Sequence, residues 1–202
     1  MGRSGGLHNH ARASACGRCP KRGLIPADSQ AVQGLGRSRG GLTTKAHTLC
    51  DGRGRALATR ITPGQAADTR ELAPLLDTVA VPRPTGQGRP RKRPDHLLAD
   101  KAYGSKANRR PLRGRGIAHT IPERDDVIAN RTRKGSAGGR PPNFNPARYK
   151  DRNQVERGFN RRKQHRAVAT RYDKLASRYQ ATLTIASIMD WLRAAPDSRS
   201  TR

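Results

Sequence analysis

The stretch HLLADKAY, residues 96–103, decides the expected fold, because a short apolar run ends there on an acidic residue. Leu97, Leu98 and Ala99 follow one another without a polar break, which predicts a strand buried on both faces. Open α/β sheets place ligand chemistry at the carboxyl ends of such strands, so Asp100 is a candidate site residue. The alternative is a local role for Asp100, as a cap or turn residue before Gly104.

The flanking sequence predicts alternating strands and helices. Residues 105–115 form a basic helix candidate, and IAHTIP, residues 117–122, reads as a second strand. Upstream, residues 43–50 and 56–61 predict a β-hairpin around the turn DGRG. Between the hairpin and residue 96, a helix is expected over the leucine-rich segment that starts near Asp68. This order favours an α/β sheet.

Two helices are expected after these strands, the first over residues 146–166 and the second over residues 177–193. In the second helix, apolar residues recur at i, i+3, i+4 and i+7, which predicts that this face packs on the core. They are Ile185, Ile188, Met189 and Leu192.

The charge balance points to a polyanionic partner. Among 202 residues there are 42 Lys plus Arg against 15 Asp plus Glu, for a formal net charge of +27, and nucleic acid is the usual partner of such a protein. With 33% hydrophobic residues, one modest core is expected. We expect a basic tail or loop over residues 1–41, one domain over 42–193 with flexible basic loops at 80–94 and 129–146, and a disordered tail over 194–202.

The sequence favours a cytoplasmic, nucleoid-associated protein. Its longest apolar stretch, ATLTIASIMDWL, is too short to span a membrane and contains Asp190, and no signal-peptide pattern follows the N-terminus. Cys50 is expected to be a small core residue. A zinc site is an alternative for the remaining cysteines, a CxxC pair of the right spacing, together with two nearby histidines, whose H-x-H spacing is unusual. These four residues are His8, His10, Cys16 and Cys19.

One acid stands in very basic surroundings within YKDRNQVERGFNRRKQ, residues 149–164. On a helix, Tyr149, Arg152, Glu156 and Lys163 would fall within an arc of about 60°. An ordinary, solvated Arg152–Glu156 pair is one interpretation. The other joins Glu156 with Asp100 as ligands of Mg²⁺, which takes carboxylates together with substrate phosphates.

The signature Y-x2-R-x3-E-x6-K of the DDE transposases of bacterial insertion sequences is matched at every spacing by Tyr149, Arg152, Glu156 and Lys163. The segment LADKAY also resembles the one that carries the second aspartate of that family. The resemblance covers about residues 34–193. It implies a ribonuclease H-like core, a mixed sheet flanked by helices. It also implies Asp100 and Glu156 as catalytic acids that bind two Mg²⁺ or Mn²⁺ ions, Arg152 and Lys163 on DNA phosphates, and Tyr149 positioning the strand.

The resemblance further implies that double-stranded DNA, as transposon ends and target, is the substrate, with a second copy or an upstream transposase chain as possible partner. The family has its first aspartate on the first strand, but Asp28 is the one acid before Asp51 and lies in the turn-like IPADSQ. We therefore expect the first strand to be missing or incomplete and activity to be impaired. A degenerate remnant and a second reading frame joined by frameshifting both stay open, and the alternative function is a non-enzymatic basic nucleic-acid-binding protein.

Overall fold

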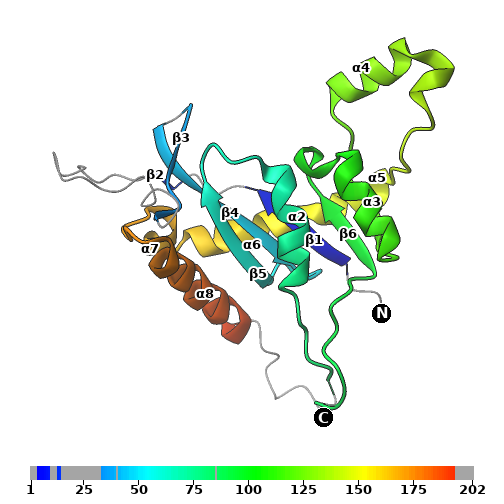
Figure 1. Cartoon of the computed structure of the whole chain (residues 1–202). Coiled ribbons are helices and arrows are strands. Elements are labelled where there is room, and N and C mark those ends of the chain that lie inside the picture. The colour runs from blue at the N-terminus through cyan, green and yellow to red at the C-terminus, as the bar shows by residue number, and fades with distance from the viewer. Residues whose placement is uncertain (1–3, 10–12, 15–32, 40, 85, 194–202) are drawn as a thin grey trace.

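The computed structural model describes residues 4–9, 13–14, 33–39, 41–84 and 86–193. Its centre is a mixed sheet in which β4 (Gly41–Cys50) pairs antiparallel with β5 (Ala56–Pro63) and with β1 (Ser4–Asn9). On its other edge β1 pairs in parallel with β6 (His96–Ala99), which pairs in parallel with β7 (Ala118–Thr120). The strands therefore lie side by side in the order β5, β4, β1, β6, β7 (Figure 1).

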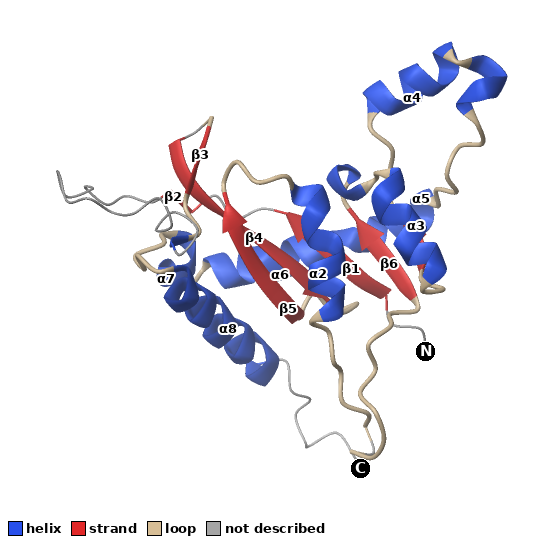
Figure 2. Ribbon diagram, in the orientation of Figure 1, coloured by secondary structure: helices blue, strands red, loops and turns tan. Residues whose placement is uncertain are grey.

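Helices cover both faces of this sheet (Figure 2). The 3₁₀ turn η1 (Asp68–Glu71), α2 (Leu72–Asp77) and α3 (Lys106–Gly114) lie on one face, where leucines of α2 and α3 pack on Leu49 and Leu97. On the other face lie α6 (Asn153–Lys163), α7 (Arg166–Ala169) and α8 (Ala176–Arg193), which enclose a second apolar cluster around Ala46. The expected mixed α/β architecture is confirmed.

The segment around residue 96 folds as its sequence predicts. Strand β6 is buried at Leu97, Leu98 and Ala99, and the 3₁₀ turn η2 (Lys101–Tyr103) and α3 follow before the chain enters β7. Because β7 returns parallel to β6, the carboxyl ends of both strands meet at one edge of the sheet.

The hairpin of β4 and β5 is also confirmed, and one aspartate closes its turn. The Asp51 Oδ1 atom accepts hydrogen bonds from the backbone N–H groups of Arg53 and Arg55, each at 2.9 Å. The Arg55 guanidinium pairs with Asp51 Oδ2 at 2.6 Å. Gly54 has φ +76°, and a Cβ atom on it would stand 2.2 Å from the carbonyl oxygen of Gln154, so glycine alone lets this turn lie against α6.

The expectation of a tail or loop over residues 1–41 is wrong for three strands. Strand β1 lies at the middle of the sheet, and β2 (Ala13–Ser14) and β3 (Gly36–Ser38) both pair with β4. A strand of six residues, β1, is thus present in a region where none was expected. Its sequence SGGLHN carries no strand-like alternation of apolar and polar residues. Backbone pairing on both of its edges specifies β1 instead.

The two expected basic loops differ from each other. Over the described residues 80–84 and 86–94 there is one isolated bridge, between Val81 and Arg91, and no helix. Residues 129–146 were expected to be a loop, but the last residues of α4 (Asp125–Arg133) and the 3₁₀ turn η3 (Gly135–Gly138) lie there. Acidic residues in the first turn of α4 and arginines in its last turn complement the helix dipole and stabilise the helix. The basic, loop-like composition of the segment did not indicate this helix. Together α4 and η3 form an arm that stands away from the sheet (Figure 1).

Helix α8 occurs where it was expected, but the predicted buried face is wrong. Exposed fractions on that face are 61% for Ile185, 52% for Ile188, 40% for Met189 and 67% for Leu192. The helix instead buries Tyr179, Leu183, Ala186 and Asp190.

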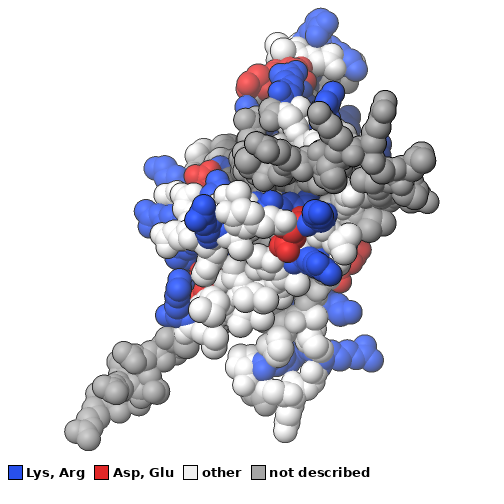
Figure 3. All heavy atoms as spheres, turned by 90° about the vertical axis from the view of Figure 1, so that its left-hand side faces the viewer, with Lys and Arg blue, Asp and Glu red and all other residues white. Residues whose placement is uncertain are grey.

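Polar anchors explain which face of α8 is buried. The Trp191 Nε1 atom donates to the Ala56 carbonyl at 2.7 Å, and the Gln180 amide donates to the Thr59 carbonyl at 2.8 Å. Both bonds tie α8 to β5, so its apolar stripe points to solvent. In Figure 3, which looks at the side where α8 lies, uncharged atoms accordingly fill much of the centre of the face. Within the described ranges, no helix is both long enough and apolar enough to cross a bilayer.

Candidate functional site

Asp100 occupies the position at the carboxyl end of β6 that its sequence context predicts. Its Oδ1 atom accepts a hydrogen bond from the Lys101 backbone N–H at 2.7 Å, so one oxygen caps η2. The side chain is 26% exposed, and its Oδ2 atom faces Arg152 at 4.0 Å. The cap interpretation is therefore correct for one oxygen and leaves the second oxygen available to a charged partner.

Arg152 connects the two acids of the candidate site. Its Nη1 atom lies 2.9 Å from Glu156 Oε1, and its Nη2 atom lies 4.0 Å from Asp100 Oδ2. Both carboxylates thus converge on a single guanidinium, although one follows a strand and the other lies on a helix. The arrangement is more than the ordinary i, i+4 helix pair that was the alternative interpretation of Arg152 and Glu156.

The helical run that carries these residues has a break in its geometry. Helix α5 (Pro146–Tyr149) passes through the 3₁₀ turn η4 (Lys150–Arg152) into α6. Val155 and Phe159 are buried against the sheet. A Cβ atom on Gly158 would stand 2.0 Å from the Gly54 carbonyl oxygen, so α6 lies directly on the hairpin turn. This close approach fixes the height of Glu156 above the sheet.

Tyr149 joins the cluster through Arg152, whose guanidinium carbon lies 5.8 Å from the centre of the Tyr149 ring. Phe144 packs on Tyr149 at 5.3 Å between ring centres. Burial raises the pKa of the Tyr149 hydroxyl, with Arg152 acting in the opposite direction, so the phenol is neutral at physiological pH. Three of the four signature residues are therefore in contact.

Lys163 lies apart from them at the end of α6, where its Nζ atom is 5.4 Å from the centre of the Phe159 ring. Seven residues of helix separate it from Glu156, a rise of about 10 Å. The ammonium group is exposed and belongs to the surrounding basic surface, not to the acid pair.

Strand β1 runs beside β6 at the level of these acids. Leu7 is the register partner of Ala99, so the next residue, His8, lies level with Asp100 along the parallel pair. No residue of SGGLHN is acidic. Asp28, the weak candidate for a first acid, lies outside the described residues, as do His10, Cys16 and Cys19 of the possible zinc site. Among residues with described side chains, no group of three or more His, Cys, Asp or Glu is placed to hold a metal ion.

His47 is a packing residue of the core. His47 is fully buried and bonds the Tyr103 hydroxyl through Nδ1 at 2.9 Å and the Thr62 hydroxyl through Nε2 at 2.8 Å. Cys50 is likewise a core residue, and burial raises the pKa of its thiol. The sequence did not reveal the buried pair of Arg162 and Asp190, which joins α6 to α8 at 3.9 Å, because nothing near either residue in the sequence indicates a partner on the other helix.

The chain is similar to proteins described as transposases. The family model described as "Transposase DDE domain" matches residues 16–191. The chain is 37% identical over 122 residues to a protein from Burkholderia cepacia titled "Putative transposase for insertion sequence element IS402", covering 60% of this chain and 49% of that protein. It is 29% identical over 152 residues to a Brucella ovis protein with the same title for element IS6501, covering 75% of this chain and 100% of that protein. The chain thus spans about half the length of the first relative.

Proposed function

Because the chain belongs to the transposase DDE domain family of insertion sequences, we propose that it acts on double-stranded DNA by metal-dependent phosphodiester cleavage and strand transfer. We also propose that its core is ribonuclease H-like. The order of the sheet supports this assignment, since β5, β4 and β1 are antiparallel neighbours and the parallel strands β6 and β7 extend the sheet beyond β1, with helices on both faces. A second copy or an upstream transposase chain is the proposed protein partner.

The convergence of Asp100 and Glu156 on Arg152 carries the functional proposal. Carboxylates on separate elements repel each other unless a cation lies between them, and Arg152 provides that cation here. A protein that only coats DNA has no need to bring two acids together within a surface of net positive charge. The pair of acids supports a site that binds a metal ion and a DNA phosphate together.

The donor set fits a hard divalent cation. Mg²⁺ and Mn²⁺ take carboxylate oxygens and are commonly bound by one or two of them together with a substrate phosphate. Asp100 Oδ2 and Glu156 Oε1 would hold the ion, while Asp100 Oδ1 stays on the cap of η2. When bound, the ion supplies a Lewis acid that polarises phosphate oxygens and lowers the pKa of water. A second ion, as in a two-metal site, would need donors beyond these two carboxylates.

The basic residues of the signature orient the DNA strand in this proposal. Arg152 contacts the acid pair, and its guanidinium can donate a hydrogen bond to a phosphate that approaches it. Tyr149 presents a neutral hydroxyl and a ring beside the same guanidinium, suited to positioning a sugar or base. Lys163 contacts phosphate further along the duplex, at about 10 Å from Glu156.

We expect cleavage by the chain as it stands to be weak, because β1 offers no carboxylate beside Asp100. The test is nicking of labelled duplex DNA with Mn²⁺ by the natural chain and by Leu7→Asp and His8→Asp variants. Adjacent residues of a strand face opposite sides, so these two variants present an acid on each face of β1.

Cleavage that rises in one of the two variants, and is abolished there by Asp100→Asn or Glu156→Gln, supports the proposal. If neither variant cuts, and Mn²⁺ binding does not change in Asp100→Asn or Glu156→Gln, the chain is better described as a non-enzymatic basic DNA-binding protein.

A further inference from the structure

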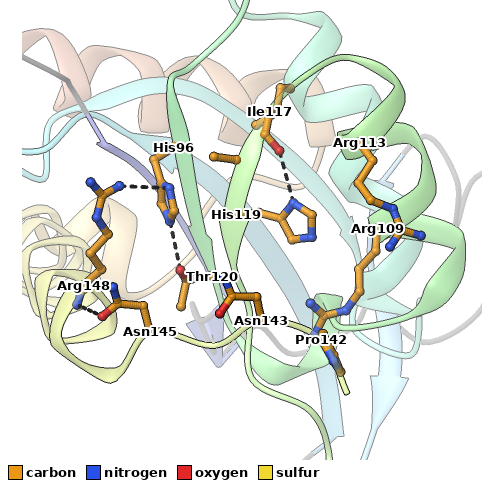
Figure 4. Close-up of a pocket in the computed structure, with 11 residues that line it drawn as sticks. His96, Arg109, Arg113, Ile117, His119, Thr120, Pro142, Asn143, Asn145 and Arg148 are labelled. Atoms are coloured by element: carbon orange, nitrogen blue, oxygen red, sulfur yellow. Dashed lines mark hydrogen bonds between the residues drawn. The ribbon is translucent and has the colours of Figure 1, made fainter. Parts of the chain in front are cut away.

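A second polar region lies at the opposite end of β6 from Asp100. It is a pocket of about 590 Å³ between the start of β6, strand β7, helix α3, and α5 with the segment that leads into it (Figure 4). His96 and Asp100 are four residues apart, so about 13 Å of strand separate the His96 side of the pocket from the acid pair. Arg109 reaches closer to the Asp100 end, since it bonds the Ile121 carbonyl, one residue past the register partner of Leu98.

The lining of the pocket is positively charged and contains no acidic side chain. Arg109, Arg113 and Arg148 contribute three guanidinium groups, and Asn143 and Asn145 add amides. Glu123, the acid that most affects Arg109, is itself paired with Arg131 of the α4 arm. The pocket therefore has a net positive charge that no acid of its wall neutralises.

Arg109 is the residue that marks this pocket as a binding site. Its side chain is buried, with the residue 5% exposed, and it donates from Nη2 to the Ile121 carbonyl at 2.7 Å and from Nε to the Gly104 carbonyl at 3.0 Å. Its Nη1 atom is also buried and has no hydrogen-bond partner among the described residues. Figure 4 shows this side chain running from α3 toward Pro142 and Asn143, along the wall of the pocket. A buried, unpaired guanidinium N–H is costly unless a ligand accepts its hydrogen bond.

The two histidines of the pocket are held neutral, which leaves the arginines to provide the charge. The Arg148 guanidinium donates to His96 Nδ1 at 3.1 Å, so His96 Nε2 carries the proton and donates to Thr120 Oγ1 at 2.9 Å. Burial, helped by Arg148, lowers the pKa of His96, and burial lowers the pKa of His119 as well.

We propose that this pocket binds a backbone phosphate of DNA through Arg109, Arg113 and Arg148, as a second anchoring point for the duplex whose scissile phosphate lies at the Asp100 end of β6. The inference rests on the proposed function for its partner, but the anion site itself does not depend on catalysis. A phosphodiester has the charge, the acceptor oxygens and the size to meet the unpaired Arg109 Nη1 and the two exposed guanidinium groups. Arg148 directly precedes Tyr149, so one helical run touches both ends of the strand.

The test monitors the imidazole resonances of His96 and His119 by NMR during titration first with inorganic phosphate and then with a short duplex. The probe variant is Arg113→Gln with Arg148→Gln, both exposed residues whose loss should leave the fold intact. The matched control is Arg110→Gln with Arg178→Gln, which removes the same charge from exposed arginines outside the pocket. Arg109→Lys serves as a second probe that keeps the charge but loses the guanidinium fork.

Both titrants should shift the two histidines in the natural chain and in the control. The affinity for phosphate should fall at least about tenfold in the double probe variant, since two charge-assisted hydrogen bonds are lost. A response to phosphate but not to DNA would overturn the assignment to a DNA phosphate and leave a site for a free anion. No response to either would overturn the site. A response to DNA in a chain that never cuts would keep this site while the catalytic proposal fails.

Discussion

Arg152 determines how the acid pair behaves before any metal ion is present. Its guanidinium contacts Glu156 at 2.9 Å and faces Asp100 at 4.0 Å, so a divalent cation must compete with it for the same oxygens. We expect Arg152→Ala to strengthen Mn²⁺ binding by up to about fivefold, the effect of one partly exposed ion pair. Titration of Mn²⁺ by calorimetry or paramagnetic resonance measures this change.

Arg157→Ala is the control for that titration, because it removes the same charge from an exposed neighbour on α6. Weaker Mn²⁺ binding in Arg152→Ala than in Arg157→Ala would show that Arg152 organises the acid pair instead of competing for it.

His47 predicts how stability responds to pH. Burial lowers its pKa below the ordinary value of 6.5, so the folded chain holds it neutral while the unfolded chain takes up a proton. Stability is therefore retained above that value and lost as the pH falls below it. Urea unfolding at pH 7.5 and pH 5.5 should show lower stability at the acidic pH. His47→Gln should reduce this difference without abolishing it, because His96 and His119 titrate in the same sense. An unchanged difference would contradict the role given to His47.

The contact between α6 and the hairpin turn depends on the absence of two side chains. A Cβ atom on Gly158 would meet the Gly54 carbonyl at 2.0 Å, a backbone atom that cannot rotate away. Gly158→Ala should therefore destabilise the fold by about 1–3 kcal/mol, the usual range for overpacking. Gly114→Ala is the matched control, since nothing lies within 4 Å of its added Cβ atom. Thermal unfolding of the two variants gives the comparison, and equal melting temperatures would contradict the close packing.

The two faces of α8 should respond differently to the same kind of truncation. Leu183 is 3% exposed, so Leu183→Ala should cost about 2–5 kcal/mol of stability. Ile188 is 52% exposed, and Ile188→Ala should change stability by no more than about 0.5 kcal/mol. Denaturant unfolding of both variants tests the assignment of the buried face. If Ile188→Ala destabilised the fold more than Leu183→Ala, the buried face would be the one that the apolar periodicity of α8 predicts.

Local signals in the sequence predicted those elements whose residues interact mainly with near neighbours. The turn at Asp51 is closed by hydrogen bonds to neighbouring residues, and the apolar run at Leu97 is visible in the sequence. The hairpin, β6, α3 and β7 could therefore be predicted. Strand β1 could not, because its pairing with Leu49 and Ala99 comes from distant parts of the chain. The buried face of α8 was missed for the same reason, since the hydrogen bond from Trp191 to Ala56 is not visible in helical periodicity.

The candidate site follows the same pattern. The spacing of Tyr149, Arg152 and Glu156 indicated a shared face, and the structure brings these three into contact. Sequence alone could pair Glu156 with Asp100 only as a hypothesis, because their proximity depends on how α6 packs against the sheet. Arg109 was missed altogether, since a basic helix gives no sign of which arginine will be buried.

At the scale of the whole molecule, charge dominates the encounter with DNA. A net charge of +27 predicts tight duplex binding at low salt through release of counterions. If the chain contacts roughly six to ten phosphates, its affinity should fall by about 10³–10⁵ between 50 and 200 mM salt. Fluorescence anisotropy with an unrelated duplex measures the slope. A shallow slope would mean that the positive charges do not act together on one DNA.

The protruding arm has a consequence for how the molecule is assembled. It joins β7 to α5, so Asp100 precedes it in the chain and Glu156 follows it, while α4 and η3 stand clear of the sheet. A protease that cuts within the exposed, arginine-rich α4 would leave one acid on each fragment, and the packing of α6 and α8 against the sheet would hold the fragments together. The chain is in effect two complementing halves whose covalent link is remote from the acid pair, and co-purification of the nicked halves would show it.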